Sequence, residues 1–175
     1  REMSDLFAIQ DEIAGAIAEA LRVRLLPAAD QPNLTGTTNL EAYELYLQGV
    51  NLWHLRTGES LEQALALFQQ AVDLDPAFAR AHAYLALTLG ILPDYGDRTI
   101  AEIQPATRAA AETALALDPD SVEAGTALIQ PLGADSRAEL EALIERGRQL
   151  IEHNPGFPTT HQWHATNLLV AGLFE

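Results

Sequence analysis

The stretch Ala64-Leu65-Ala66-Leu67-Phe68-Gln69-Gln70-Ala71-Val72-Asp73-Leu74-Asp75-Pro76 decides the fold class of this chain. Its small residues Ala64 and Ala71 and its aromatic Phe68 share one face of a helix, because they are four and three positions apart. The Asp-Pro step ends that helix, since proline disfavours helical backbone in the residue before it. We expect Ala71 to be buried at a helix crossing, with Phe68 filling the gap beside it.

This spacing ahead of a proline recurs twice. The matching positions are Thr107, Ala111, Ala114 and Pro119 in a second unit, and Leu143, Gly147, Leu150 and Pro155 in a third. Reading forward from the three prolines gives Leu85-Ala86, Leu128-Ile129 and His164-Ala165 at equivalent positions. Such a repeat indicates stacked units of the same local structure, and Ala114 is expected to be buried as Ala71 is.

The pattern resembles the tetratricopeptide repeat, whose motif runs W-x2-L-G-x2-Y, G-x-Y, A-x3-F-x2-A and a closing proline. The resemblance implies an all-α fold, a right-handed α-α superhelix of helix pairs, with three full repeats and half of a fourth. The repeat domain then spans 39–175, in units 39–76, 77–119, 120–155 and a truncated 156–175. Helices are predicted over 5–26, 39–55, 60–74, 78–91, 99–117, 121–131, 136–153 and 158–171.

A different helix precedes the repeats. Its apolar stripe consists of Leu6, Ile9, Ile13, Ile17, Leu21 and Leu25. This spacing of three and four predicts an amphipathic helix within 1–26, followed by a linker over 27–38 that is rich in Pro, Gly, Asn and Thr. Thr38-x-x-Glu41 predicts a capping box for the first repeat helix, and Ser60 is expected to cap the second. The turn-rich segment 92–98 is expected to form an insertion between helices.

A wider resemblance follows. Residues 5–14 resemble the last helix of the TolB-like domain of bacterial signalling proteins, in which a linker, a segment like 41–49 and tetratricopeptide repeats come next. The resemblance implies fusion to a winged-helix regulator or a nucleotide cyclase, so we expect the chain to be part of a longer protein. The resemblance does not fix the location of the protein, which is either the bacterial cytoplasm or, if a membrane span lies upstream, the periplasm.

Composition excludes several functions. The chain has 175 residues, 25 of them acidic and 10 basic, all ten arginine, with a net charge of -15. This charge disfavours nucleic acid and anionic membrane surfaces as partners of this fragment. The absence of cysteine excludes disulfides, thiolate zinc sites and a cysteine nucleophile. No apolar run approaches the ~20 residues of a membrane span.

The sequence offers little support for a metal site or a catalytic site. His161-x-x-His164 would share a helical face near His153, but both positions also belong to the repeat frame, so we expect no metal. Segment 94–97 lacks the alternating oxygen ligands of a calcium loop. The sequence supports no nucleophile site with a His/Asp arrangement and no phosphate-binding glycine loop. We therefore expect no cofactor and no enzymatic activity.

Binding of a protein or peptide is the remaining function. The repeat frame places the following residues on the concave face: Tyr43, Tyr46, Val50, Trp53 and His54; Arg80, Ala83 and Leu87; Glu123, Thr126 and Gln130; Thr159, Gln162 and Thr166. Aromatic side chains with polar tips are common interface anchors. The alternative is that they pack against the linker or the amino-terminal helix. A chaperone-tail clamp is disfavoured, because lysine is absent.

The sequence leaves three functions open. The chain is a scaffold that binds a protein partner of a bacterial signalling or transcriptional regulator, or a self-association module that dimerises that regulator, or the non-catalytic part of an adenylate or guanylate cyclase. A homodimer would use helix 5–26 or the truncated C-terminal repeat. We expect the apolar stripes of both segments to lack a cover in this chain, and such stripes usually find a partner.

Overall fold

The computed structural model describes residues 36–130, 134 and 136–172. The chain divides into two compact units, Arg1–Thr38 and Asn39–Glu175. The predicted helix 5–26 and most of the linker lie outside the described residues. The second unit is all-α: its described residues form seven helices and no strand, which confirms the fold class at that level.

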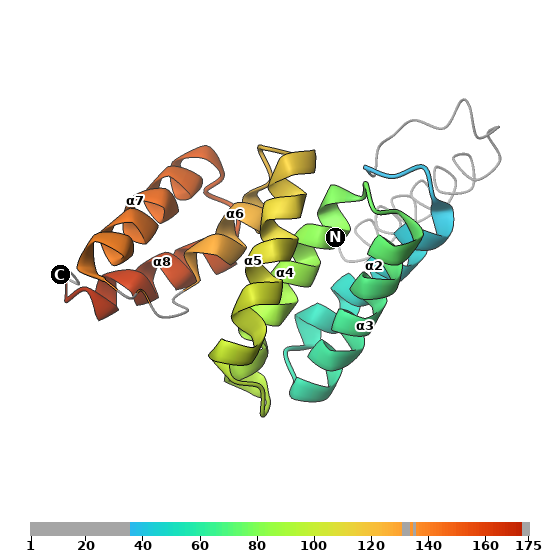
Figure 1. Ribbon diagram of the computed structural model, residues 1–175, viewed down its shortest axis with the longest axis horizontal. Helices are drawn as coiled ribbons and strands as arrows, with labels where there is room; N and C mark the ends of the chain where they lie inside the picture. The colour runs from blue at the N-terminus through green and yellow to red at the C-terminus, as the bar shows by residue number, and fades with distance from the viewer. Residues whose placement is uncertain (1–35, 131–133, 135, 173–175) are drawn as a thin grey trace, which may run out of the picture. The chain divides into compact units, whose positions relative to one another are not determined.

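The helices pack pairwise and in order (Figure 1). Each helix contacts the next along the chain, and the first helices of successive pairs also contact one another: α2 with α4, α4 with α6, and α6 with α8. Helix pairs stacked side by side produce this pattern of contacts. The elements are α2 (Leu40–Leu55), α3 (Gly58–Leu74), α4 (Ala79–Tyr95), α5 (Ile100–Leu117), α6 (Val122–Ile129), α7 (Arg137–His153) and α8 (Pro158–Val170).

One predicted boundary is wrong. Helix α4 does not stop at residue 91 but continues through Pro93 to Tyr95. Proline removes one backbone donor and crowds the preceding turn. Here the residues from Ala83 to Leu92 are all buried, and the amide of Gly96 closes the last turn on the carbonyl of Leu92. Burial of this helix outweighs the local cost of proline, so the expected insertion is shorter.

Two predicted caps are also wrong. The α2 cap is Asn39, whose Oδ1 accepts the amide of Ala42 at 3.1 Å, and not Thr38. The α3 cap is Thr57, and Ser60 is its partner in a capping box: Thr57 Oγ1 accepts the Ser60 amide, and Ser60 Oγ accepts the Thr57 amide, both at 3.1 Å. Both helices therefore begin at a short polar side chain that accepts a hydrogen bond from a backbone amide without a partner inside the helix.

The predicted small–large–small packing is confirmed. Ala71, Ala114 and Phe68 are fully buried. Phe68 of α3 lies directly against Gly49 of α2, where an added Cβ would meet its ring at 2.6 Å. The glycine lets the two helices approach closely, and the ring fills the space that remains.

In the third pair, α6 and α7, a glycine again lies against a large side chain. A Cβ on Gly125 of α6 would lie 2.7 Å from Leu150 of α7. Between α7 and α8 the glycine belongs to the second helix of the pair and the large side chain to the following first helix. A Cβ on Gly147 of α7 would lie 2.6 Å from His164 Nδ1 of α8. At the α2–α3, α6–α7 and α7–α8 crossings, a glycine thus faces a larger side chain.

Two buried polar contacts join α8 to α6. The hydroxyls of Thr126 and Thr160 lie 2.6 Å apart, and Asn167 Nδ2 donates to the carbonyl of Ile129 at 2.6 Å. Ile129 is the last residue of α6, so this amide takes up a carbonyl that the helix itself leaves unpaired. Because hydrogen bonds require specific geometry, these contacts orient α8 on α6.

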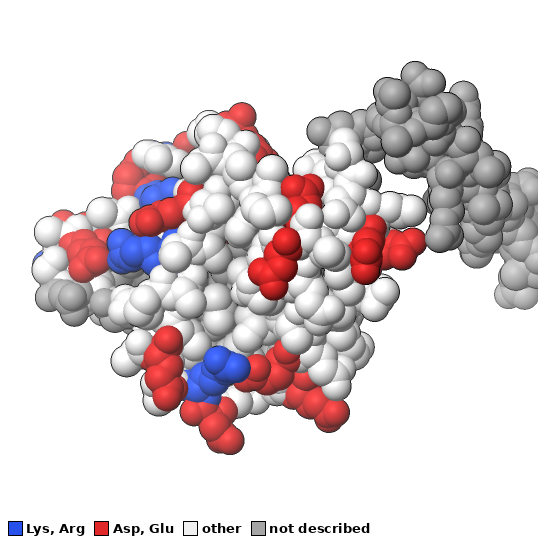
Figure 2. Space-filling view, turned by 45° about the vertical axis from the view of Figure 1, so that its right-hand side comes forward, with Lys and Arg blue, Asp and Glu red and all other residues white. Residues whose placement is uncertain are grey.

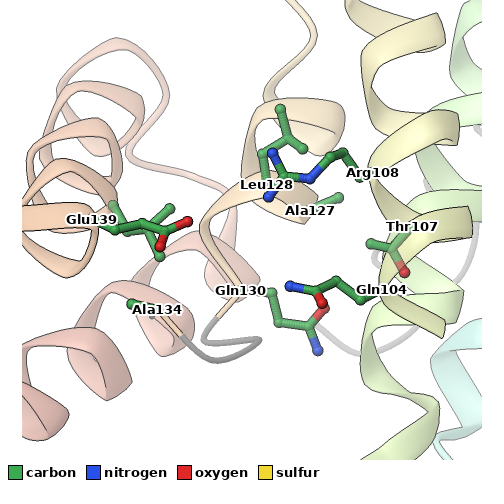
Figure 3. Close-up of a pocket in the computed structure, with 9 residues that line it drawn as sticks. Gln104, Thr107, Arg108, Ala127, Leu128, Gln130, Ala134 and Glu139 are labelled. Atoms are coloured by element: carbon green, nitrogen blue, oxygen red, sulfur yellow. The ribbon is translucent and has the colours of Figure 1, made fainter. Parts of the chain in front are cut away.

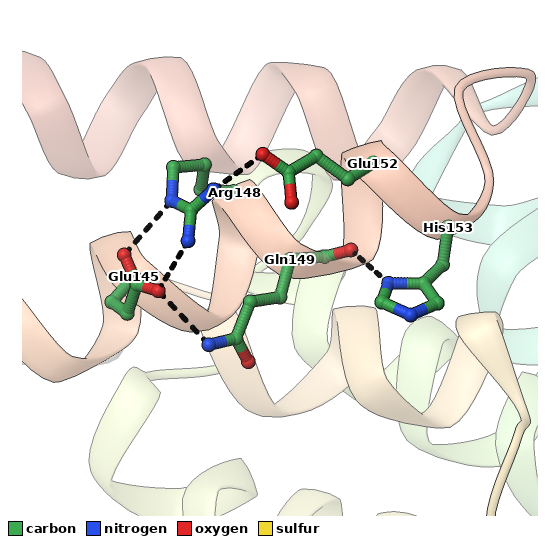
Figure 4. A network of polar contacts seen from close by, with 5 residues as sticks. All are labelled: Glu145, Arg148, Gln149, Glu152 and His153. Carbon is green, nitrogen blue, oxygen red and sulfur yellow. Dashed lines mark hydrogen bonds and ion pairs between the residues drawn. The ribbon is translucent and has the colours of Figure 1, made fainter.

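The surface of α7 carries a polar network (Figure 4). Arg148 forms ion pairs with Glu145, at 2.6 Å, and with Glu152, while Gln149 donates to Glu145 at 2.9 Å. The hydrogen bond from Arg148 lowers the pKa of Glu145 to about 2. Exposed ion pairs one helical turn apart stabilise a helix only weakly, so the network supports α7 without deciding the fold.

Charge on the visible face of the molecule is mixed rather than basic. Figure 2 shows the basic side chains of that face next to acidic ones, with broad uncharged areas between them. Such a face offers no continuous basic stripe for a phosphate backbone. Among the described residues, none of the helices combines the length and apolar character needed to cross a bilayer.

Candidate functional site

The face formed by the first helix of each pair carries a row of aromatic rings. Tyr84 of α4 lies between two residues of α2, with ring centroids 5.4 Å from Tyr46 and 5.5 Å from Trp53. Both contacts are edge-to-face, the arrangement that aromatic pairs prefer. All three side chains are buried, so the row forms the floor of the face and fixes α2 against α4.

An arginine lies over each end of this row. Arg80 Cζ is 5.2 Å from the centre of the Tyr46 ring, and Arg56 Cζ is 3.7 Å from the centre of the Trp53 ring. Arg56 also ends α2 in the left-handed conformation, at φ 53°, which residues other than glycine adopt rarely. We call Arg80, Tyr46, Tyr84, Trp53 and Arg56 the aromatic–arginine row.

Burial shapes the electrostatics of the row. It raises the pKa of the Tyr46 and Tyr84 hydroxyls, which therefore stay protonated. The charge of Arg80 opposes this shift at both, and the half-buried Glu123 of α6 adds to it. Burial also lowers the pKa of Arg56, the expected direction for a cation that has lost part of its water. The row thus combines neutral hydroxyls, two cations and one nearby carboxylate.

The predicted concave face is accessible only in part. The accessible or half-buried residues are Tyr43, Val50, His54, Arg80, Glu123, Gln162 and Thr166. Buried instead are Tyr46, Trp53, Ala83, Leu87, Thr126, Gln130 and Thr159. The second group differs from the prediction, because these side chains are buried. Tyr46 and Trp53 contact Tyr84 of the next first helix, and Thr126 contacts Thr160. The prediction overlooked that contact between neighbouring first helices uses the same face.

Sequence reasoning missed two members of the row, Arg56 and Tyr84. Arg80 and Tyr84 are four residues apart and so share a helical face, a signal that could have identified Tyr84. Arg56 gives no such signal, because its position depends on the left-handed backbone that turns it back over Trp53.

A small cavity lies between α5, α6 and the beginning of α7 (Figure 3). It measures about 40 Å³ and is lined by residues that include Gln104, Arg108, Gln130 and Glu139. Ligand pockets for small molecules commonly measure ~300–1,000 Å³. This cavity therefore has room for a few water molecules and not for a nucleotide.

Two further depressions in the described part of the chain are more open. One of about 620 Å³ is lined by Glu59, Glu62, Asp97 and Glu102, with Arg98 held by Glu62 at 2.6 Å. These carboxylates repel phosphate groups.

The candidate metal pair is engaged in other contacts. His161 Nε2 lies 2.9 Å from the carbonyl of Pro155, and His164 packs against Gly147. His153 Nδ1 faces the carbonyl of Gln149 at 2.7 Å. Within the described ranges, no three His, Cys, Asp or Glu side chains come together as metal ligands would. The expected absence of a metal stays a prediction.

Comparison with known proteins links the chain weakly to a signalling protein. It is similar to a protein named putative adenylate cyclase 3 from Rhizobium meliloti (strain 1021), with 31% identity over 88 residues. The alignment covers 50% of this chain and 15% of that relative, so the chain spans a small part of the relative's length. No protein-family model and no solved structure matches the chain.

Proposed function

We propose that residues 39–175 form a non-catalytic protein-interaction scaffold within a larger bacterial signalling protein. The observation that carries the proposal is the first-helix face, where Arg80 and Arg56 overlie buried aromatic rings and Tyr43 and His54 are at least partly accessible. Arginine and aromatic side chains gathered at one place are typical of energetically important interface residues.

The repeat frame supports the proposal. Helix pairs of tetratricopeptide type stack into a right-handed superhelix, in which the first helices line the concave face. The contacts of α2 with α4, α4 with α6 and α6 with α8 agree with such stacking. A rigid face built from several helices presents side chains with little loss of conformational entropy on binding, which favours affinity.

The relative supports a signalling context. It is named a putative adenylate cyclase, and the aligned segment is 15% of its length. We propose that this chain likewise belongs to a multidomain regulator and contributes binding rather than catalysis. The described cavities agree with this role, because the one between α5, α6 and α7 is too small for a nucleotide and a larger one is lined by carboxylates.

Co-purification from the cell that encodes the chain tests the scaffold. The variant carries Tyr43→Glu and Arg80→Glu on the first-helix face, and the matched control carries Glu112→Arg on the exposed surface of α5. A scaffold predicts a protein that is recovered with the original chain and the control but lost with the face variant. Equal recovery from all three chains would contradict the proposal.

Self-association is the second candidate. It is favoured by Leu169 and Val170 of α8, which are 65% and 64% exposed and adjacent. Exposed apolar side chains that gather at one place often mark an interface. Light scattering separates the two functions: replacement of Leu169 and Val170 by serine converts a dimer to a monomer only if this surface joins two copies.

A further inference from the structure

We propose that the two arginines of the aromatic–arginine row bind carboxylates of an acidic peptide segment in a partner protein. This inference deepens the scaffold role and rests on it. It names the chemistry of the partner and the two side chains, Arg56 and Arg80, that recognise it.

The two arginines of the row lack an anionic partner in the described part of the chain. Within the described part of the chain, Arg98, Arg137 and Arg148 form ion pairs with nearby glutamates, whereas Arg56 and Arg80 form none. Acidic groups are abundant in this chain, with 25 against 10 basic residues. The two guanidinium groups on the first-helix face therefore remain available for an anion supplied by another molecule.

The two arginines of the row are also preorganised. Both guanidinium groups are held over an aromatic ring, Arg56 at 3.7 Å and Arg80 at 5.2 Å. Stacking fixes a long side chain while its N–H groups stay able to form paired hydrogen bonds to a carboxylate. Arg108 and Arg146 also form no ion pair among the described residues, but neither lies over an aromatic ring, and both are exposed. They serve as charge-matched controls.

Arg56 is also partly desolvated. Arg56 is only half-exposed, and burial lowers its pKa. A cation that has lost water without gaining an anionic partner is less stable than a paired one, and a carboxylate would offset that cost. Because three rings lie between the two arginines, a peptide with acidic groups at several positions suits the row better than a single anion.

One nearby group opposes the binding of anions. Glu123 is half-buried on α6, and its charge acts on the hydroxyls of Tyr46 and Tyr84. A bound carboxylate would be repelled by Glu123. The proposal therefore makes a prediction of opposite sign: Glu123→Gln strengthens binding of the acidic peptide, while loss of either arginine weakens it.

The experiment titrates the whole chain with a fluorescent peptide of five Glu-Ala repeats and, separately, with its Gln-Ala counterpart. Fluorescence anisotropy is measured at low and at physiological salt, because screening weakens exposed charge pairs. We expect the acidic peptide alone to bind. R56Q/R80Q should raise its Kd by about tenfold or more, since hydrogen bonds to charged groups are strong. R108Q/R146Q should change it less than about twofold, and E123Q should lower it about twofold to fivefold.

Several outcomes would overturn the proposal: no binding of the acidic peptide, equal binding of the neutral peptide, or equal loss in the charge-matched control. Light scattering of R56Q/R80Q adds another, since a change in mass would show that the arginines bind a second copy. Should R56Q disturb folding, R80Q alone is informative, because Arg80 is exposed. The acidic peptide could fail to bind while the Tyr43→Glu/Arg80→Glu variant still loses a cellular partner. That result would support the scaffold function and contradict only the proposal that the partner is acidic.

Discussion

His164 of α8 fills the space that a side chain on Gly147 of α7 would need. A Cβ at position 147 would lie 2.6 Å from His164 Nδ1 and 3.2 Å from His164 Cβ. In the first pair, Phe68 is the large residue at the position that corresponds to Gly147. The third unit exchanges the sizes, so a histidine takes over the packing role of the missing aromatic.

This contact predicts that Gly147→Ala destabilises the chain. Overpacking costs ~1–3 kcal/mol and exceeds the ~0.5–1 kcal/mol that alanine gains over glycine in a helix. Urea unfolding measures the difference. Ala142→Gly, at an exposed position of α7, measures the local propensity alone. A Gly147→Ala variant that is more stable than the original chain would show that the crossing has room to spare.

Acid should weaken the α7–α8 packing through His164. Burial, and then the charge of His161, lower the pKa of His164 below its usual value, so the folded chain binds this proton less readily than the unfolded chain. As pH falls through the unfolded value of ~6.5, the unfolded state gains the proton first and the free energy of unfolding decreases.

His164→Leu tests this link. Leu85 and Leu128 hold the equivalent positions in the other units, so leucine fits the frame. We expect the free energy of unfolding to fall less between pH 7.5 and 5 in His164→Leu than in the original chain. The exposed His153→Gln serves as control. An unchanged pH dependence in His164→Leu would refute the assignment.

Ala71→Phe should lower stability by ~1–3 kcal/mol, because Ala71 is fully buried where α3 crosses its neighbours. The matched variant Ala66→Phe lies on the exposed side of the same helix and should have little effect. Thermal unfolding followed by circular dichroism compares the two. Similar melting temperatures for both variants would argue against close packing at position 71.

The sequence was most informative along single helices. The closing prolines and the A-x3-F-x2-A spacing predicted which residues of α3 and α5 are buried, because burial there follows from helical periodicity. It was less informative about contacts between pairs. The repeat frame assigned Tyr46 and Trp53 to a binding face. The spacing of residues within one helix does not reveal that Tyr84 of the next pair covers them. The left-handed backbone of Arg56 had no sequence signal, since glycine is the usual residue there.

The hydroxyl pair between α6 and α8 provides a double-mutant cycle. Thr126 and Thr160 are buried and bonded at 2.6 Å, so Thr160→Val leaves a buried hydroxyl without this partner and should cost ~1–3 kcal/mol. The double variant with valine at both positions should be nearly as stable as the original chain, because both polar groups are removed together. Additive losses in chemical unfolding would mean that the two hydroxyls do not interact.

The central claim is that the first-helix face binds another protein. Site-specific photo-cross-linking in the cell that encodes the chain tests it most directly, with the photoreactive residue at Tyr43 and, as controls, at Glu112 of α5 and Glu141 of α7, which are both exposed. The account predicts one dominant cross-linked product from position 43, a protein other than this chain, and none from the controls. Products that contain only this chain, or the same products from all three positions, would contradict it.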